Sequence, residues 1–169
     1  MATTAKLYSY NFTSVRTYLF AIIFIAGNLL LPQLAHFVPN GGPMLLPIYF
    51  FTLIAAYKYG IRVGLLTALL SPLINNMIFG MPMMAMLPVI LIKSTLLATA
   101  ASYAAKYFGK ISFVGVLLSI VAYQVVGAGF EWVLLQDINA ALQDFTLGFP
   151  GMLIQLFGGY ALLKAIAKV

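Results

Sequence analysis

The 169-residue chain has very few charged residues and no cysteine. Lys, Arg, Asp and Glu make up only 7% of it, while hydrophobic residues make up 63%. An ordinary soluble domain has about 25% charged residues. So few charges could not cover a water-facing surface, which excludes a soluble enzyme, a secreted scaffold and a disordered tail. The lack of cysteine excludes disulfides and thiolate metal sites, and a single histidine, His36, excludes a multi-histidine metal site.

Motifs for catalysis and for nucleic-acid binding are also missing. The chain has no Walker-type phosphate loop, so it cannot hydrolyse ATP by that route, and it has neither an HExxH nor a GxSxG motif. Its nine Lys and Arg residues occur singly between apolar runs. A nucleic-acid surface needs a clustered basic patch. We therefore expect a membrane protein that is not an enzyme, with no cofactor, no metal and no nucleic-acid partner.

The apolar runs predict an all-α fold, a single domain of six transmembrane helices in the lipid bilayer. A span needs about 20 apolar residues, and turn clusters such as 39–43 and 80–82 separate the runs. The predicted spans are residues 16–36, 44–59, 62–79, 84–108, 111–135 and 148–167. The fourth span begins near Met84 or at Pro88, because proline is tolerated in the first turn of a helix. The first run is interpreted as a retained helix, since no small-x-small cleavage site follows it.

The charges between the predicted spans predict the orientation of the chain. Eight basic residues fall on one side of the six-helix arrangement, and none falls on the other. They are Lys6, Arg16, Lys58, Arg62, Lys106, Lys110, Lys164 and Lys168. The opposite loops carry His36, Asp137 and Asp144. Positive charge marks the cytoplasmic side, so both termini are predicted to be cytoplasmic.

Lys93, the ninth basic residue, lies inside the fourth apolar run. A lysine at the bilayer centre costs about 2.5–3.5 kcal/mol on insertion scales. Glu131, the only acid within an apolar run, is predicted at a similar depth in the outer half of the membrane. Three interpretations stay open: a structural Lys93–Glu131 ion pair, a ligand site in which Lys93 faces a substrate carboxylate, and snorkelling of the lysine to the headgroups.

Polar residues of the other predicted helices converge on the same depth. Thr67, Ser71 and Asn75 share one helix face by their spacing of four, and Gln124 shares a face with Glu131. Such residues either hold helices together or contact a ligand, because buried amides need partners. Trp132 is interpreted as an interfacial anchor or as a stacking partner for a ring. The candidate substrate-binding residues are Asn75, Asn76, Lys93, Gln124, Glu131, Trp132 and Gln155.

Three segments carry a family resemblance. They are Pro47-Ile48-Tyr49-Phe50, Lys58-Tyr59-Gly60-Ile61-Arg62-Val63-Gly64 and Phe149-Pro150-Gly151-Met152-Leu153-Ile154-Gln155. With the six short helices, they resemble the substrate-binding S component of energy-coupling factor transporters over nearly the whole chain. The resemblance implies a binder of a vitamin or related micronutrient, possibly one with a carboxylate, in the cytoplasmic membrane of a prokaryote. It also implies docking onto a membrane scaffold protein that carries two ATPase subunits.

In that family an Ala-xxx-Ala pattern on the first helix contacts the scaffold. Here the first helix departs from the pattern, with Ala21 and Ala26 five residues apart and Gly27 next to them. Gly64 and Ala68 form a small-xxx-small pair on the third predicted helix. These five residues are the candidates for helix packing or docking. A structural subunit of a cell-envelope morphogenesis complex and a small membrane enzyme are the alternative functions.

Overall fold

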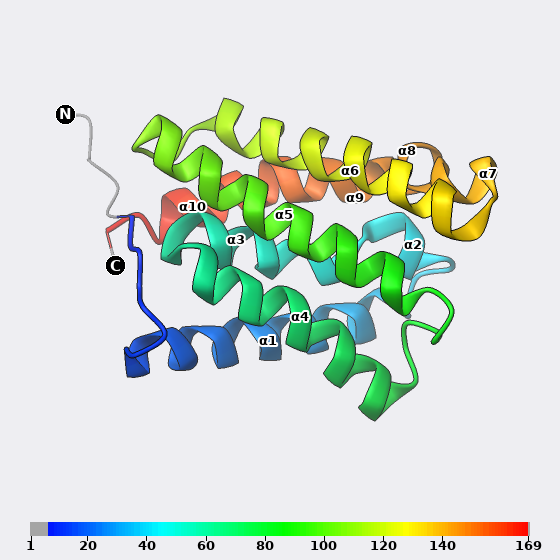
Figure 1. The fold of residues 1–169 in the computed structure, drawn as a ribbon, viewed down its shortest axis with the longest axis horizontal. Helices are drawn as coiled ribbons and strands as arrows, with labels where there is room; N and C mark the ends of the chain where they lie inside the picture. Colours follow the sequence, from blue (N-terminus) through cyan, green and yellow to red (C-terminus); the bar gives the residue numbers. More distant parts are fainter. Residues whose placement is uncertain (1–6, 169) are drawn as a thin grey trace.

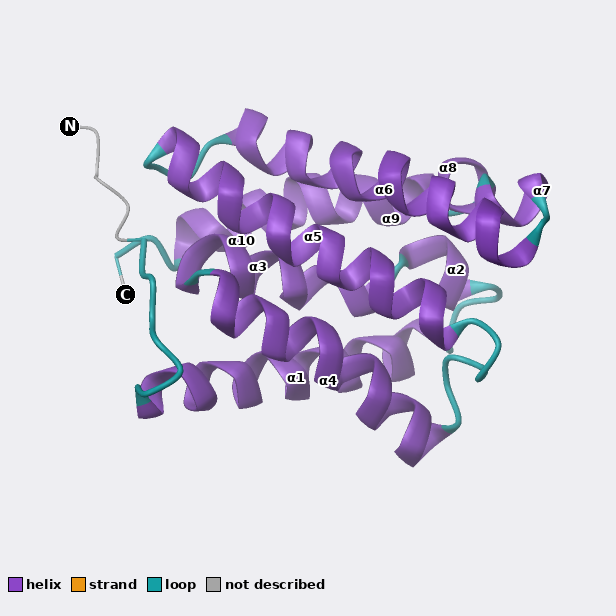
Figure 2. Ribbon diagram, viewed as in Figure 1, coloured by secondary structure: helices purple, strands orange, loops and turns teal. Residues whose placement is uncertain are grey.

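The computed structural model describes residues 7–168, so Lys6, one of the predicted cytoplasmic charges, lies outside the described residues. These residues form helices joined by short connections, and no strand occurs among them (Figure 2). The prediction of an all-α fold is confirmed.

Four helices within residues 7–168 are long and apolar enough to cross a membrane. They are α1 (Val15–Ala35), α4 (Ile61–Phe79), α5 (Leu87–Phe108) and α6 (Phe113–Leu135). Their 19 to 23 residues correspond to roughly 28–35 Å at the helical rise, which matches a hydrocarbon core about 30 Å thick. The chain thus has the architecture of a multi-pass membrane protein. The start of α5 at Leu87 agrees with the alternative at Pro88 and not with Met84.

The second predicted span, residues 44–59, is not one continuous helix. It consists of α2 (Gly41–Leu45), the 3₁₀ helix η1 (Pro47–Tyr49) and α3 (Phe50–Tyr59). The break lies at Leu46, which has a φ of 48°, and Pro47 has no N–H with which to continue a helix. The prediction of a continuous helix was therefore wrong. We call residues 41–59 the broken segment.

The last predicted span, residues 148–167, is also irregular. It contains α9 (Phe149–Leu153), the π-helical turn η2 (Ile154–Gly158) and α10 (Gly159–Ala165). The short helices α7 (Ile138–Ala141) and α8 (Gln143–Thr146) precede it. The part containing α7 and α8 is bent by 49° from the part that follows, and together they make a fifth candidate span. Six spans stay a prediction.

The helix α3 lies at the centre of the bundle. All of its residues from Thr52 to Tyr59 are buried, because α3 packs against α1, α4 and α5. The contact with α4 is close at Gly64, where an added Cβ would lie 2.5 Å from Cβ of Ala56. Helix α5 packs against α6 on its other side (Figure 1).

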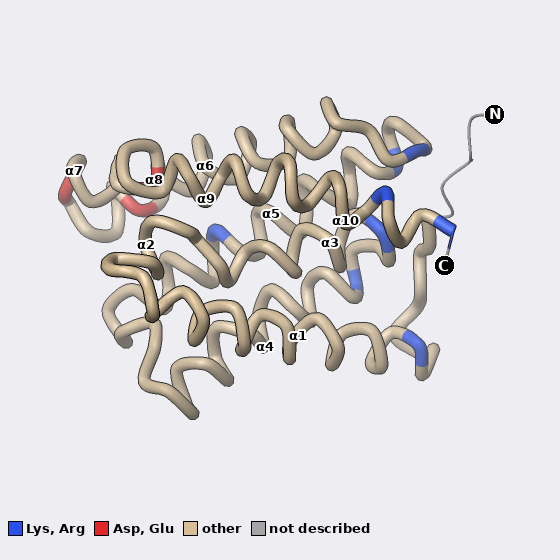
Figure 3. The backbone as a smooth tube through the Cα atoms, turned by 180° about the vertical axis from the view of Figure 1, so that it is seen from behind, with Lys and Arg blue, Asp and Glu red and all other residues tan. Residues whose placement is uncertain are grey.

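The two ends of the bundle differ in charge. Both ends of the described chain lie at one end of the bundle, and α7 and α8 lie at the other (Figure 1). Figure 3 shows that Lys and Arg gather at the end with the termini, whereas Asp and Glu lie near α7 and α8. The N-terminal segment is tied to the basic end, where the Tyr8 N–H donates to the Lys58 carbonyl at 2.9 Å. Arg62 similarly donates to the Tyr10 carbonyl at 3.0 Å.

Candidate functional site

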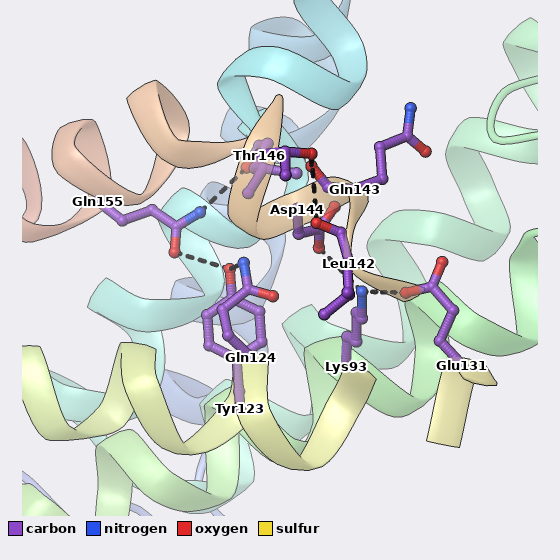
Figure 4. A network of polar contacts seen from close by, with 10 residues as sticks. Lys93, Tyr123, Gln124, Glu131, Leu142, Gln143, Asp144, Thr146 and Gln155 are labelled. Atoms are coloured by element: carbon purple, nitrogen blue, oxygen red, sulfur yellow. Dashed lines mark hydrogen bonds and ion pairs between the residues drawn. The ribbon is translucent and has the colours of Figure 1, made fainter. Parts of the chain in front are cut away.

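Lys93, near the start of α5, binds carboxylates from two other helices. Its Nζ donates to Oε2 of Glu131 on α6 and, at 2.9 Å, to Oδ2 of Asp144 on α8 (Figure 4). The side chains of Lys93 and Glu131 are 3% and 4% exposed, and that of Asp144 is 15% exposed. The predicted Lys93–Glu131 pair is therefore present, and the buried, paired amine does not fit the snorkelling interpretation. We call these three residues the ion cluster.

A glycine on α6 makes room for the lysine. An added Cβ at Gly127 would lie 2.6 Å from Cγ of Lys93, which is closer than carbon atoms pack. Gln124 and Glu131 are three residues before and four residues after Gly127, so all three share one helix face. The stem of Lys93 therefore crosses α6 between Gln124 and Glu131.

A chain of hydrogen bonds leads from α6 to the broken segment. Gln124 Nε2 donates to the Tyr123 hydroxyl at 3.0 Å, and this hydroxyl donates to Oε1 of Gln155 at 3.1 Å. Gln155 Nε2 then donates to the Leu46 carbonyl at 3.4 Å (Figure 4). We call these four residues the polar chain. It joins two of the predicted site residues, Gln124 and Gln155, which are both fully buried.

Two backbone irregularities meet in the polar chain. Leu46 has a positive φ, which is uncommon for a bulky residue. Gln155 belongs to the π-helical turn, a feature that is frequent at functional sites. The helix α9 packs closely against α2. An added Cβ at Gly151 would lie only 2.5 Å from the Leu45 carbonyl carbon. Irregular backbone at membrane depth is tolerated where it is buried in protein or lines a cavity.

Two buried side-chain atoms lack a hydrogen-bond partner within residues 7–168. They are Oγ of Ser94 and Oε1 of Gln124. Ser94 follows Lys93 on α5, and Gln124 belongs to the polar chain. Buried polar atoms in native proteins almost always have a partner, so these two mark unused capacity for hydrogen bonding.

Three predicted site residues lie apart from this arrangement. Asn75 Oδ1 accepts from Gln33 Nε2 at 3.4 Å, and Asn76 Nδ2 donates to the Pro82 carbonyl at 2.6 Å. Trp132 is 53% exposed, which agrees with an interfacial anchor. No hydrogen bond described within residues 7–168 joins these three to the ion cluster or to the polar chain.

Asn28 on α1 forms a second polar centre, which was not predicted. Its Nδ2 donates to Thr52 Oγ1 at 3.0 Å and to Ser71 Oγ at 3.3 Å. Its Oδ1 accepts from the Phe51 N–H at 3.1 Å, one of the first-turn N–H groups of α3 that have no partner within the helix. Ser71, part of the predicted polar face, therefore contributes to helix packing.

Asp144, Tyr123 and the Leu46 carbonyl are the site groups that sequence analysis missed. Asp144 lies in a predicted outer loop, and helical periodicity does not indicate that this loop folds back over Lys93. The available signal was the charge of Lys93 itself, since a buried lysine needs acids and only three acids occur in the chain. Tyr123 is one residue from Gln124, but its hydroxyl reaches Gln155 across the bundle.

The five packing or docking candidates lie mostly inside the bundle. Ala21, Gly64 and Ala68 are buried. An added Cβ at Gly27 would lie 2.6 Å from the Phe51 ring. Ala26 is exposed. The packing interpretation thus fits four of the candidates, and docking stays a prediction.

A cavity of about 250 Å³ lies at the basic end. It is lined by Leu7, Tyr8, Ser9, Ala56, Tyr57, Gly60, Ser102, Ala105, Lys106 and Gly109. The sequence did not indicate it. It lies between the N-terminal segment, α3 and α5, away from the ion cluster.

Comparison with protein-family models, with curated proteins and with solved structures gave no match to this chain. Within residues 7–168 no group of three His, Cys, Asp or Glu residues could hold a metal ion. The candidate site is therefore defined by the contacts within this chain. It is a buried ion cluster beside a polar chain, enclosed by apolar helices.

Proposed function

We propose that this protein is the substrate-binding subunit of an energy-coupling factor type importer. It captures a vitamin or related micronutrient from the outer face of a prokaryotic cytoplasmic membrane. The observation that carries the proposal is the buried ion cluster, which involves α8 at the end opposite the termini, beside the unpartnered oxygen of Gln124 near the middle of α6. The resemblance of residues 47–50, 58–64 and 149–155 to that family supports it, because segment 149–155 contributes Gln155 to the polar chain and segment 47–50 directly follows Leu46.

The proposal includes the orientation of the chain. The broken segment and the bent C-terminal part cross the membrane as the second and sixth spans, and both termini lie in the cytoplasm. The gathering of Lys and Arg at the end with the termini supports this orientation (Figure 3). The ion cluster then lies toward the outer face, where the substrate arrives.

Energy for uptake comes from other subunits. The chain has no Walker-type phosphate loop, so we propose that it docks onto a membrane scaffold that carries two ATPase subunits. The alternative function is a structural subunit of a morphogenesis complex. That function does not explain why the buried oxygen of Gln124 has no hydrogen-bond partner within residues 7–168.

Two measurements test the function. Mass spectrometry of the protein purified from its own host should detect one small molecule that is enriched over a detergent blank and released by denaturation. Liposomes with this chain alone should not accumulate that molecule, whereas liposomes that also contain the scaffold and the ATPases should do so in the presence of ATP. Uptake by the chain alone, or the absence of any enriched molecule, would contradict the proposal.

A further inference from the structure

We propose that the ligand of this site is a cation with N–H donors, such as a protonated primary amine or an amidine. This inference rests on the proposed function and gives it a substrate class. It is carried by the charge of the ion cluster and by the buried acceptor of Gln124. These two observations are independent of each other.

The ion cluster has an excess of negative charge. It contains one ammonium group and two carboxylates, so its formal charge is −1 when all three groups are ionised. Charge that is removed from water is costly unless an opposite charge balances it. A ligand with one positive charge makes the enclosed site neutral, whereas an anionic ligand increases the imbalance.

Each side chain of the polar chain donates its hydrogen bond toward Leu46, which leaves an unpartnered acceptor on Gln124, the residue at the other end. A backbone carbonyl only accepts, so Gln155 must turn its amide nitrogen toward the Leu46 carbonyl and its oxygen toward Tyr123. The Tyr123 hydroxyl donates to that oxygen and therefore accepts from the amide nitrogen of Gln124. The carbonyl oxygen of Gln124 is then the unused atom, as the structure shows.

This unused oxygen points toward the ion cluster. Figure 4 shows the Gln124 oxygen on the Lys93 side of the Tyr123 ring. Gln124 and Glu131 lie seven residues apart on one face of α6, a distance of roughly 10 Å along the helix. Lys93 engages one oxygen of each carboxylate, and a carboxylate can accept through both oxygens. The site thus offers acceptors over the length of a small molecule, and they match a ligand that donates.

A carboxylate ligand is the rival, and it makes an opposite prediction for Asp144. A carboxylate that binds Lys93 competes with Asp144 for the ammonium group. Removing the charge of Asp144 then strengthens its binding. For a cationic ligand, removing that charge takes away attraction and weakens binding. The sign of the change distinguishes the two ligand classes.

The experiment uses the full-length protein in detergent and matched probes that differ in one group. One series is pyridoxamine, pyridoxine and 4-pyridoxate, and the other is tryptamine, tryptophol and indole-3-acetate. They carry an ammonium, a hydroxyl and a carboxylate group, respectively. We expect an ammonium probe to raise the melting temperature and its carboxylate counterpart to leave it unchanged.

The variant Asp144→Asn should then weaken binding of the ammonium probe about tenfold or more. Asp137→Asn is the matched control, because Asp137 is exposed in the same region, caps α7 and is replaced by an equally good cap residue. It should leave the affinity unchanged.

A carboxylate probe that binds, and binds more tightly to Asp144→Asn, would overturn the cationic class and leave the binding function in place. If no ammonium probe binds, the cationic class is overturned. If in addition no small molecule is enriched with the purified protein, the proposed function fails as well.

Discussion

At the scale of single residues, Lys93 joins three helices. Its ammonium group connects α5 to α6 and α8, and its side chain is almost fully buried. Removing one partner of a buried ion pair typically costs about 3–5 kcal/mol, because the remaining charge is left uncompensated. The position of Lys93 depends in turn on Gly127, since any side chain at Gly127 would meet the lysine stem.

The first prediction compares two glycines of α6. Gly127→Ala should lower the free energy of unfolding by about 1–3 kcal/mol, the usual cost of overpacking, because the new Cβ displaces Lys93 from its carboxylates. Gly129→Ala is the control, since Gly129 is exposed and an added Cβ meets nothing within 4 Å. It should be neutral or stabilising by up to about 1 kcal/mol. Thermal unfolding of both variants in detergent is the measurement. Equal stabilities would show that Lys93 adapts without cost.

At the scale of elements, the broken segment is held in place by its neighbours. Its helix α3 has only ten residues, about half of the 20 that a single helix needs to span a bilayer. Asn28 on α1 accepts the N–H of Phe51 at the start of α3, and Gln155 donates to the carbonyl of Leu46 at the break. Side chains from other helices thus satisfy backbone groups that a continuous helix would pair internally.

The second prediction concerns this support. Asn28→Leu keeps a similar volume but removes the partners of the Phe51 N–H and of Thr52 and Ser71. The loss of stability should be about 1–3 kcal/mol, the cost of leaving a buried polar group unpaired. Gln33→Leu, on the same helix, removes a bond that is half-buried and 3.4 Å long. It should cost less than about 1 kcal/mol. Melting temperatures of the two variants, measured side by side, are the test. A smaller loss for Asn28→Leu would count against the supporting role.

At the scale of the whole molecule, charge divides the bundle into two ends. The Lys and Arg residues of the described chain other than Lys93 lie near the termini, and the acidic residues lie near α7 and α8 (Figure 3). The aromatic rings of Tyr8, Tyr59 and Phe20 stack at the basic end, with centroids of Phe20 and Tyr59 4.1 Å apart. This packing fixes the N-terminal segment against α1 and α3 on the side that we propose to be cytoplasmic.

The third prediction tests the orientation in cells. Because the chain has no cysteine, single cysteines report on their own positions. Gln143→Cys and Lys110→Cys replace exposed residues at opposite ends of the bundle. A membrane-impermeant maleimide added to intact cells should label Gln143→Cys but should label Lys110→Cys only after lysis. The reverse pattern would refute the orientation.

The sequence by itself determined the helical class and the four long helices, and it offered the Lys93–Glu131 pair as one of three open interpretations. Apolar runs and their breaks are local features, so they set the boundaries of α1, α4, α5 and α6 to within about three residues of those observed. The pair was an available interpretation because a buried lysine requires an acid and Glu131 is the only acid within an apolar run; the structure decided between it and the alternatives.

The tertiary structure alone decided the break at Leu46, the third member of the ion cluster and the polar chain. Apolar residues continue through Leu46, so hydropathy does not show its left-handed backbone, which contacts with the C-terminal segment hold in place. Asp144 reaches Lys93 because the loop after α6 folds back over the bundle, over a separation of 51 residues. The bonds that leave the Gln124 oxygen free join residues from three distant parts of the chain. Such contacts depend on how helices pack and where loops run, and neither is encoded in local periodicity.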